Sequence, residues 1–328
     1  MEPLSAPYAA LAGLDAALDR VSSGRARSLV LLAGGLAFFA APIVARPDEP
    51  LATRALPLAT FLAALACTVA GVRSQRTAPW IVALVALLAT FKVLAASWAA
   101  RDAMGVAVLA IPIGVSYYVL RGISALVDVS RRGRGADSLE VAGYLAFVPI
   151  LSLGPIERLG TFLAQRKPDA RAGRLGEDLQ QATLRIVEGA FKILVLAEAF
   201  RGAAAPFHRG EATWVSVYAS LLHLWLDFSG ATDLAIGAAR LFGVKVMENF
   251  DLPFSRPSLA EFWRSWHISL SSWLRDYLFF PIAKRLPAGS APFVAPFLVM
   301  SLCGLWHGLT LPFFVWGLTQ GAGLAAHQ

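Results

Sequence analysis

Four apolar stretches, each close to the length of a membrane-crossing helix, follow one another in the first half of the chain. They occupy residues 28–45, 55–72, 79–98 and 104–127. A helix needs about 20 apolar residues to cross the hydrocarbon core of a bilayer, and a helix satisfies its own backbone polar groups there. The pattern predicts an all-α, polytopic membrane bundle. The composition agrees, because 57% of the residues are hydrophobic, 16% are charged and the mean hydropathy is +0.59.

The charges between these stretches indicate an orientation. Arginines with no acid between them lie just before the first stretch, after the second and after the fourth: Arg20, Arg25 and Arg27, then Arg73 and Arg76, then Arg131, Arg132 and Arg134. The loops after the first and third stretches also contain acids. Because Lys and Arg are enriched in cytoplasmic loops, the N-terminus is predicted to be cytoplasmic. Residues 1–27 begin with an acid and lack the basic start of a secretory signal, so we expect a short amphipathic lead-in there.

The second half predicts a less regular path through the membrane. Residues 140–153 are apolar but short, and Gly154-Pro155 would break a helix. A re-entrant or broken element is therefore expected, followed by spans near 182–202 and 212–238. The last apolar block, 292–326, is long enough for one span and a re-entrant piece. The sequence contains no detectable internal repeat and no obvious linker. Residues 28–328 are therefore expected to form a single membrane domain.

The segment EFWRSWHISLSSWLRDY, residues 261–277, combines aromatic rings with charge. If it is one helix, a step of about 100° per residue places Arg264, His267, Ser271 and Arg275 on one stripe, opposite the rings of Phe262, Trp266, Trp273 and Tyr277. Such a helix suits the membrane interface or the wall of a polar cavity. An interfacial anchor helix with a solvated face explains the pattern equally well.

His307 stands in the apolar run LVMSLCGLWHGLTLPFFVWG. An ionisable residue in such a run is costly and usually faces the bundle interior or a cavity. Neutral imidazole accepts a proton from a hydroxyl, so a general base is one interpretation. A core His bonded to a backbone carbonyl is the other.

Further polar residues lie in apolar surroundings and indicate a polar interior. Spacing of four residues allows Glu188 to pair with Lys192 and His223 with Asp227 along a helix. Lys92, Asp128, Arg185 and Asp233 also stand among apolar neighbours, with no role assigned to them by spacing.

Other kinds of chemistry are disfavoured. Cys67 and Cys303 are far apart and have neither metal nor disulfide spacing, and no phosphate loop, dinucleotide fingerprint or HExxH pattern occurs. No bound metal or cofactor is expected. The net charge of +7 is better explained by cytoplasmic loops and lipid headgroups than by a nucleic-acid partner.

Three motifs in order resemble a known family. The runs DFSGATDLAIGAARLFGVKVMENFDLPF, EFWRSWHISLSSWLRDYLFFP and GLWHG followed by VWG are similar to the membrane-bound O-acyltransferases. The resemblance is strongest to the bacterial branch of alginate O-acetyltransferases and teichoic-acid D-alanyl transferases, and it spans roughly residues 90 to 320. Members of this family pass an acyl group from a cytosolic thioester, through a membrane-embedded tunnel, to a hydroxyl.

The resemblance implies roles for individual residues. His307 matches the catalytic His and is expected to be the general base on the acceptor hydroxyl, and His267 with Arg264 is expected to form a donor-side or polarising pair. Tunnel or helix-junction roles are expected for the other matched positions: Trp266, Ser271, Arg275, Asp227, Ser229, Asp233, Glu248, Asn249 and Trp306.

The resemblance also implies surroundings and partners. An inner-membrane location is expected, with acetyl-CoA or an acyl carrier protein as the thioester donor. The expected acceptor is an exported cell-envelope polysaccharide or a periplasmic acetyl-transferring partner. Family members usually continue through further helices after the Trp-His-Gly motif, which are expected to be missing here. Two other interpretations stay open: a transporter or flippase of lipid or glycan, and an inactive fragment with a structural role.

Overall fold

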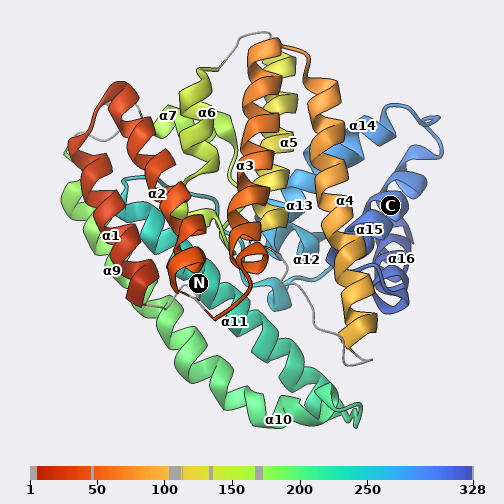
Figure 1. Ribbon diagram of the computed structural model, residues 1–328. Coiled ribbons are helices and arrows are strands. Elements are labelled where there is room, and N and C mark those ends of the chain that lie inside the picture. The colour runs from red at the N-terminus through yellow and green to blue at the C-terminus, as the bar shows by residue number, and fades with distance from the viewer. Residues whose placement is uncertain are drawn as a thin grey trace. The chain divides into compact units, whose positions relative to one another are not determined.

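Helices make up the computed structural model, which describes residues 6–45, 48–102, 112, 114–132, 136–166 and 173–326. Within these residues there is no β-strand, only one isolated bridge, so the predicted all-α class is confirmed (Figure 1). The chain divides into two compact units. The first unit comprises residues 1–38 and 142–248, and the second comprises residues 39–141 and 249–328.

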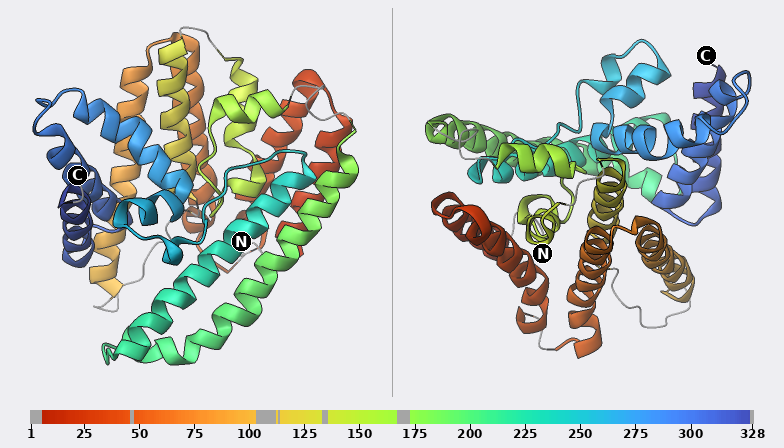
Figure 2. Two further views of the ribbon diagram at one scale, coloured as in Figure 1. Left: turned by 180° about the vertical axis from the view of Figure 1, so that it is seen from behind. Right: turned by 90° about the horizontal axis from the view of Figure 1, so that it is seen from above.

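The first unit is dominated by two long helical segments that lie side by side. Its helices are α1 (Ala6–Val21), the first part of α2 (Gly24–Ala45), the end of α6 (Ser138–Leu145), α7 (Leu159–Gln165), α9 (Leu175–Phe191), α10 (Glu198–His208) and α11 (Trp214–Leu241). A π-helical stretch, Lys192–Ala197, joins α9 to α10 without a break. The left view in Figure 2 shows α9 and α10 running along α11.

Two glycines allow α9 and α11 to cross closely. A Cβ atom added at Gly189 would lie 2.6 Å from the carbonyl oxygen of Gly230, and one added at Gly230 would lie 2.8 Å from the carbonyl oxygen of Gly189. Real Cβ atoms do not approach a backbone oxygen so closely. The crossing therefore requires a missing side chain on both helices.

In the same unit, α1 packs a carboxyl group against the apolar helix α2. Asp15 is only 4% exposed, and a Cβ atom added at Gly34 would collide with its carboxyl group. Burial, reinforced by the neighbouring charge of Asp19, raises the pKa of Asp15 from 3.8 to about 7, against the opposing effect of Arg166. Asp15 is thus protonated in the folded chain under conditions where the unfolded chain has already released the proton.

This difference predicts a pH-dependent stability. Between about pH 4 and pH 7 the folded state binds one more proton than the unfolded state, so the free energy of unfolding falls as the pH rises and levels off above about 7. Asp15→Asn should remove this slope while keeping the side-chain volume. Thermal unfolding of both forms in detergent at several pH values measures the slope, and an unchanged slope in Asp15→Asn would contradict the assignment.

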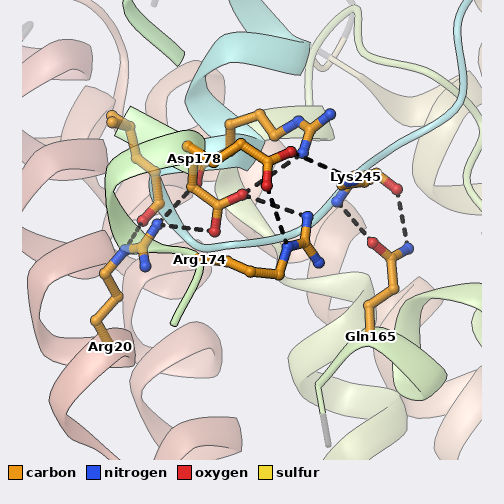
Figure 3. A network of polar contacts seen from close by, with 8 residues as sticks. Arg20, Gln165, Arg174, Asp178 and Lys245 are labelled. Atoms are coloured by element: carbon orange, nitrogen blue, oxygen red, sulfur yellow. Dashed lines mark hydrogen bonds and ion pairs between the residues drawn. The ribbon is translucent and has the colours of Figure 1, made fainter. Parts of the chain in front are cut away.

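A cluster of three guanidinium groups around one buried carboxylate ties α1 to the ends of α9 and α11 (Figure 3). Asp178, whose side chain is 2% exposed, lies 3.5 Å from Arg20, 3.6 Å from Arg174 and 3.5 Å from Arg240. Arg20 also donates to the carbonyl oxygens of Arg240 and Leu241, at the C-terminal end of α11. A cation at this end of a helix meets the negative pole of the helix dipole, and Asp178 lies at the opposite, positive pole of α9.

The second unit contains the remaining helices. These are α3 (Leu51–Ser74), α4 (Thr77–Asp102), α5 (Val115–Arg132), α12 (Leu259–Ser265), α13 (Ile268–Leu274), α14 (Phe280–Ala283), α15 (Ala291–His307) and α16 (Leu311–Ala326). Figure 1 shows α3, α4 and α5 side by side. A second π-helical stretch, Arg275–Phe279, links α13 to α14.

Within the described residues, three helices are long and apolar enough to cross a membrane: Gly24–Ala45, Leu51–Ser74 and Thr77–Ser97. They match the first three predicted spans. The fourth predicted span, 104–127, corresponds to α5 from Val115 onward, while residues 103–111 and 113 lie outside the described part of the chain.

Aromatic side chains pack around α5 and form hydrogen bonds with it or from it in the second unit. Tyr118 sits edge-on against the rings of Phe39 and Phe61, at 5.7 and 5.6 Å between centroids, and donates to Thr60 at 3.0 Å. On another side of α5, Trp273 donates to the carbonyl of Leu120 at 3.0 Å. The Tyr277 hydroxyl reaches Asp128 at 2.9 Å. The rings of the Trp-rich segment thus pack on a helix that is about 150 residues away in sequence.

Three irregular segments can be compared with the sequence predictions. The expected break near 140–153 is present, because α6 ends at Leu145 and helix resumes at α7 only after one 3-10 turn and a non-helical stretch. The predicted span 182–202 lies inside a longer continuous helical segment, 175–208. The block 292–326 forms two helices, α15 and α16, which pack closely on each other through Gly304, Gly317 and Gly321.

Candidate active site

The Trp-rich segment is broken at His267, so the prediction of one continuous helix over residues 261–277 is wrong. Helix α12 ends at Ser265, Trp266 is extended, and His267 has a φ of +43° before α13 begins at Ile268. A left-handed residue cannot continue a right-handed helix. The stripe that placed His267 in line with Arg264, Ser271 and Arg275 therefore does not exist as a helical face.

Hydrogen bonds from the preceding loop stabilise the non-helical backbone at this break. Trp266 pairs with Phe250 in the isolated antiparallel bridge, and the amide of Asp251 donates to the carbonyl of Ser265 at 3.0 Å. Asn249 accepts from the amide of Ile268 through its backbone oxygen at 2.9 Å, and from the amide of Ser269 through its side chain at 3.1 Å. Asn249 thus satisfies free amides at the first turn of α13, as a capping residue would.

Asn249→Ala should therefore weaken the junction. Loss of a side-chain acceptor at a helix N-terminus typically costs about 0.5–2 kcal/mol, and the loop that fixes His267 loosens at the same time. We expect a lower unfolding temperature. Asn249→Asp, which keeps the acceptor oxygen, should retain more of the stability, and equal effects of the two substitutions would argue against the capping role.

His267 is buried in the protein. Only 4% of it is exposed, and this burial, with a smaller contribution from His307, lowers the pKa of His267 to about 3. The imidazole is therefore neutral over the whole physiological pH range. His307 belongs to the same unit, and the two imidazoles lie close enough to interact electrostatically.

A cavity of about 470 Å³ lies beside the break. Arg264, Ser271 and Arg275 line it, together with apolar side chains of α15 and α16 that include Met300 and Leu324. Three of the four residues predicted on one polar stripe are therefore brought together, although not by a continuous helix. His267 is not among the residues that line this cavity.

The imidazole of His307 ends α15 and is surrounded by aromatic rings. It lies 4.7 Å from Trp306, 5.4 Å from Trp316 and 5.9 Å from Phe313, measured between ring centroids. A Cβ atom at Gly308 would lie 2.6 Å from the ring of Phe313. The missing side chain at this position therefore lets Phe313 stack on the imidazole. His307 itself stays exposed on one face.

A second cavity, of about 200 Å³, opens at His307. Its wall is formed by α4, the first turn of α5 and the turn after α15, with Lys92, Ser116, His307 and Thr310 as the polar lining residues. The ammonium of Lys92 lies over the ring of Trp306, 5.2 Å from the centroid. Sequence spacing could not have indicated this contact, because more than 200 residues separate the two side chains.

Asp233 and Glu248 belong to an ion-pair network of the first unit. Asp233, 4% exposed, accepts from Arg185 at 2.7 Å and from Lys192 at 2.6 Å. Arg185 also pairs with Glu248, and Lys192 with Glu188 at 2.7 Å. The predicted pairing of Glu188 with Lys192 is confirmed. The network joins α9 and the start of the π-helical stretch to α11, which is a helix-junction arrangement.

Asp227 and Ser229 lie on α11 of the first unit but outside this network. Asp227 is exposed, and Ser229 is buried with its hydroxyl 3.4 Å from the Leu226 carbonyl of the same helix. The predicted pairing of His223 with Asp227 is wrong. His223 bonds the carbonyl oxygen of Ala197 at 2.9 Å instead, because the π-helical stretch presents that oxygen to α11.

The helices and these sites define a multi-pass helical membrane protein with two neighbouring imidazoles and two cavities. A family model described as the membrane-bound O-acyltransferase family matches residues 73–328. The chain belongs to this family.

Three curated relatives illustrate the range of the similarity. A probable alginate O-acetylase of Pseudomonas fluorescens is 32% identical over 94% of this chain and 62% of its own length. A peptidoglycan O-acetyltransferase of Helicobacter pylori is 27% identical, with 67% of this chain and 48% of the relative covered. A teichoic acid D-alanyltransferase of Streptococcus thermophilus is 28% identical, with 66% and 56% covered. The chain thus spans about half the length of the curated relatives it matches.

Proposed function

We propose that this protein is a membrane-embedded O-acyltransferase that moves a short acyl group from a cytosolic thioester to a hydroxyl. The acyl group proposed is acetyl. The observation that carries the proposal is the placement of His307. An imidazole that lines a cavity, keeps an exposed face and has a second imidazole nearby is suited to act as a general base.

In the proposed reaction the acceptor hydroxyl donates its proton to His307 while its oxygen attacks the thioester carbonyl carbon. A carbon–oxygen bond forms, and the carbon–sulfur bond then breaks. The departing thiolate takes up the proton from the imidazolium, so that His307 returns to its neutral form. The imidazole thus acts first as a base and then, in its protonated form, as an acid, which is the usual role of His in acyl transfer.

His267 and Arg264 are proposed to serve the donor side. Because His267 remains neutral, it adds no positive charge next to His307 when that imidazole becomes protonated, which would otherwise disfavour the protonated form. Arg264 and Arg275 line the larger cavity and supply cations for a phosphate-bearing thioester. His267 and Arg264 are thus proposed to have different roles on the donor side.

The acceptor is proposed from what the relatives are named for. Alginate, peptidoglycan and teichoic acid are polymers of the bacterial cell envelope, so the acceptor class is an exported envelope polymer or a periplasmic acetyl-transferring partner. The donor is acetyl-CoA or an acyl carrier protein thioester. A location in the bacterial inner membrane, with a cytoplasmic N-terminus, brings the donor and the acceptor to opposite faces.

The test is acyl transfer by the purified protein in proteoliposomes. Labelled acetyl-CoA and acetyl carrier protein are supplied separately, with soluble alginate, peptidoglycan fragments or a teichoic-acid polymer as acceptor. The proposal expects label on acceptor hydroxyls and one free thiol released per acyl group transferred. Acceptor movement across the bilayer without thiol release would instead indicate a transporter, and neither activity with any donor would indicate a protein with a structural role.

A further inference from the structure

Lys92 is a basic residue in an apolar helix, and its side chain lines the same cavity as His307. It lies in Thr77–Ser97, one of the three helices apolar enough to span the membrane, with Phe91 and Val93 as neighbours. In the described part of the chain Lys92 makes no ion pair, and its ammonium lies over the face of the Trp306 ring, 5.2 Å from the centroid. A charge inside a membrane helix is costly and usually marks a functional site.

The Trp306 ring offsets only part of this cost. A cation–π contact is weak compared with a charge-assisted hydrogen bond to an anion. Lys92 also shares the smaller cavity with His307, since both side chains line it together with Ser116 and Thr310. The volume of about 200 Å³ leaves room in this cavity for a reacting carbonyl group.

We propose that Lys92 is a further catalytic residue of the acyl transfer, whose ammonium stabilises the oxyanion that forms when the acceptor oxygen attacks the thioester carbonyl. The inference rests on the proposed function. As the hydroxyl proton passes to His307, the carbonyl π electrons move onto the carbonyl oxygen, which becomes negative next to Lys92. When that electron pair re-forms the carbonyl, the carbon–sulfur bond breaks and the thiolate receives the proton from His307.

The arrangement satisfies two physical requirements of such a site. The stabilising charge is fixed before the reaction begins, held by the helix and the Trp306 ring, and it acts in surroundings poorer in water than bulk solvent. The proton acceptor and the cation line one cavity, so the charges that develop on the imidazole and on the carbonyl oxygen are compensated within the same small volume.

The test compares Lys92→Met and Lys92→Arg with the unaltered protein in the proteoliposome assay. Loss of one oxyanion donor typically lowers kcat about 10²–10³-fold. We expect a loss of this size in Lys92→Met, with KM for donor and acceptor nearly unchanged, and recovery of most of the loss in Lys92→Arg. Because removal of a charge from a membrane helix does not remove packing, the unfolding temperature of Lys92→Met should not fall.

Two reference variants make the result specific. Lys284→Met removes an exposed cation of the same unit and should leave kcat unchanged. His307→Ala tests the proposed function itself: if it abolishes transfer but Lys92→Met does not lower kcat, the inference about Lys92 is wrong and the function stands. A raised KM for the acceptor with unchanged kcat in Lys92→Met would show that Lys92 binds an anionic acceptor group instead, and would overturn the oxyanion role.

Discussion

Replacing His307 with alanine is expected to lower the rate of acyl transfer about 10²–10⁴-fold, the usual contribution of a positioned general base. The loss should fall on kcat, because the proton acceptor acts in the transition state and not in substrate binding. Single-turnover transfer from labelled acetyl thioester to polysaccharide measures it directly.

Two further substitutions separate chemistry from packing. The imidazole packs between Trp306, Phe313 and Trp316, so His307→Ala leaves a gap among aromatic rings. His307→Phe refills that gap without supplying a base, and it should be as inactive as the alanine variant but better folded. His223→Ala removes an imidazole that bonds a backbone carbonyl in the first unit, and it should retain transfer. Activity in His307→Phe would contradict the role of His307.

Asp178→Ala should be the most destabilising single substitution in the first unit, at about 3–5 kcal/mol. Removing one partner of a buried ion pair leaves the other charges uncompensated, and here three guanidinium groups lose a carboxylate that is 2% exposed. Arg20 would then be held only by the carbonyl oxygens at the end of α11, so α1 should detach early on heating. Thermal unfolding in detergent, with proteolysis at α1 as a local probe, measures the effect.

The adjacent residue provides a matched control. Glu177 lies one position earlier, and its side chain is 57% exposed, with ion-pair distances of 4.0 Å to Arg174 and 3.9 Å to Lys245. Exposed pairs of this kind contribute about 0–1 kcal/mol. Glu177→Ala should therefore change the unfolding temperature little. If both variants lost the same stability, a general charge effect rather than the buried cluster would be responsible.

The apolar helices could be predicted from the sequence, and His307 could be selected as a candidate site residue, because both signals are local. A run of about 20 apolar residues predicts a span whatever surrounds it, and His307 stands out because its neighbours are apolar. The short apolar segment ahead of Gly154-Pro155 likewise predicted the break between α6 and α7.

Features set by distant residues could not be predicted in the same way. The segment 261–277 has the aromatic and aliphatic composition of a helix, and the break at His267 depends on Asn249 and Phe250 in the preceding loop. The cavity that joins Lys92 to His307 requires α4 and α15 to pack together. The apolar sequence KILVLA at 192–197 gives no sign of its π-helical path or of its packing on α11.

The π-helical stretch also constrains how the length of this chain can vary. A π-helical turn holds more residues than an α-helical turn, so deleting one residue there would let the stretch close into an ordinary α-helix. Because the wider turn accommodates that one residue, α10 would keep nearly the same face towards α11 after the deletion. A gap of one residue at this point in the family should therefore leave the pattern of apolar residues in the following three turns unchanged, whereas a gap inside α10 would rotate every later residue by about 100°.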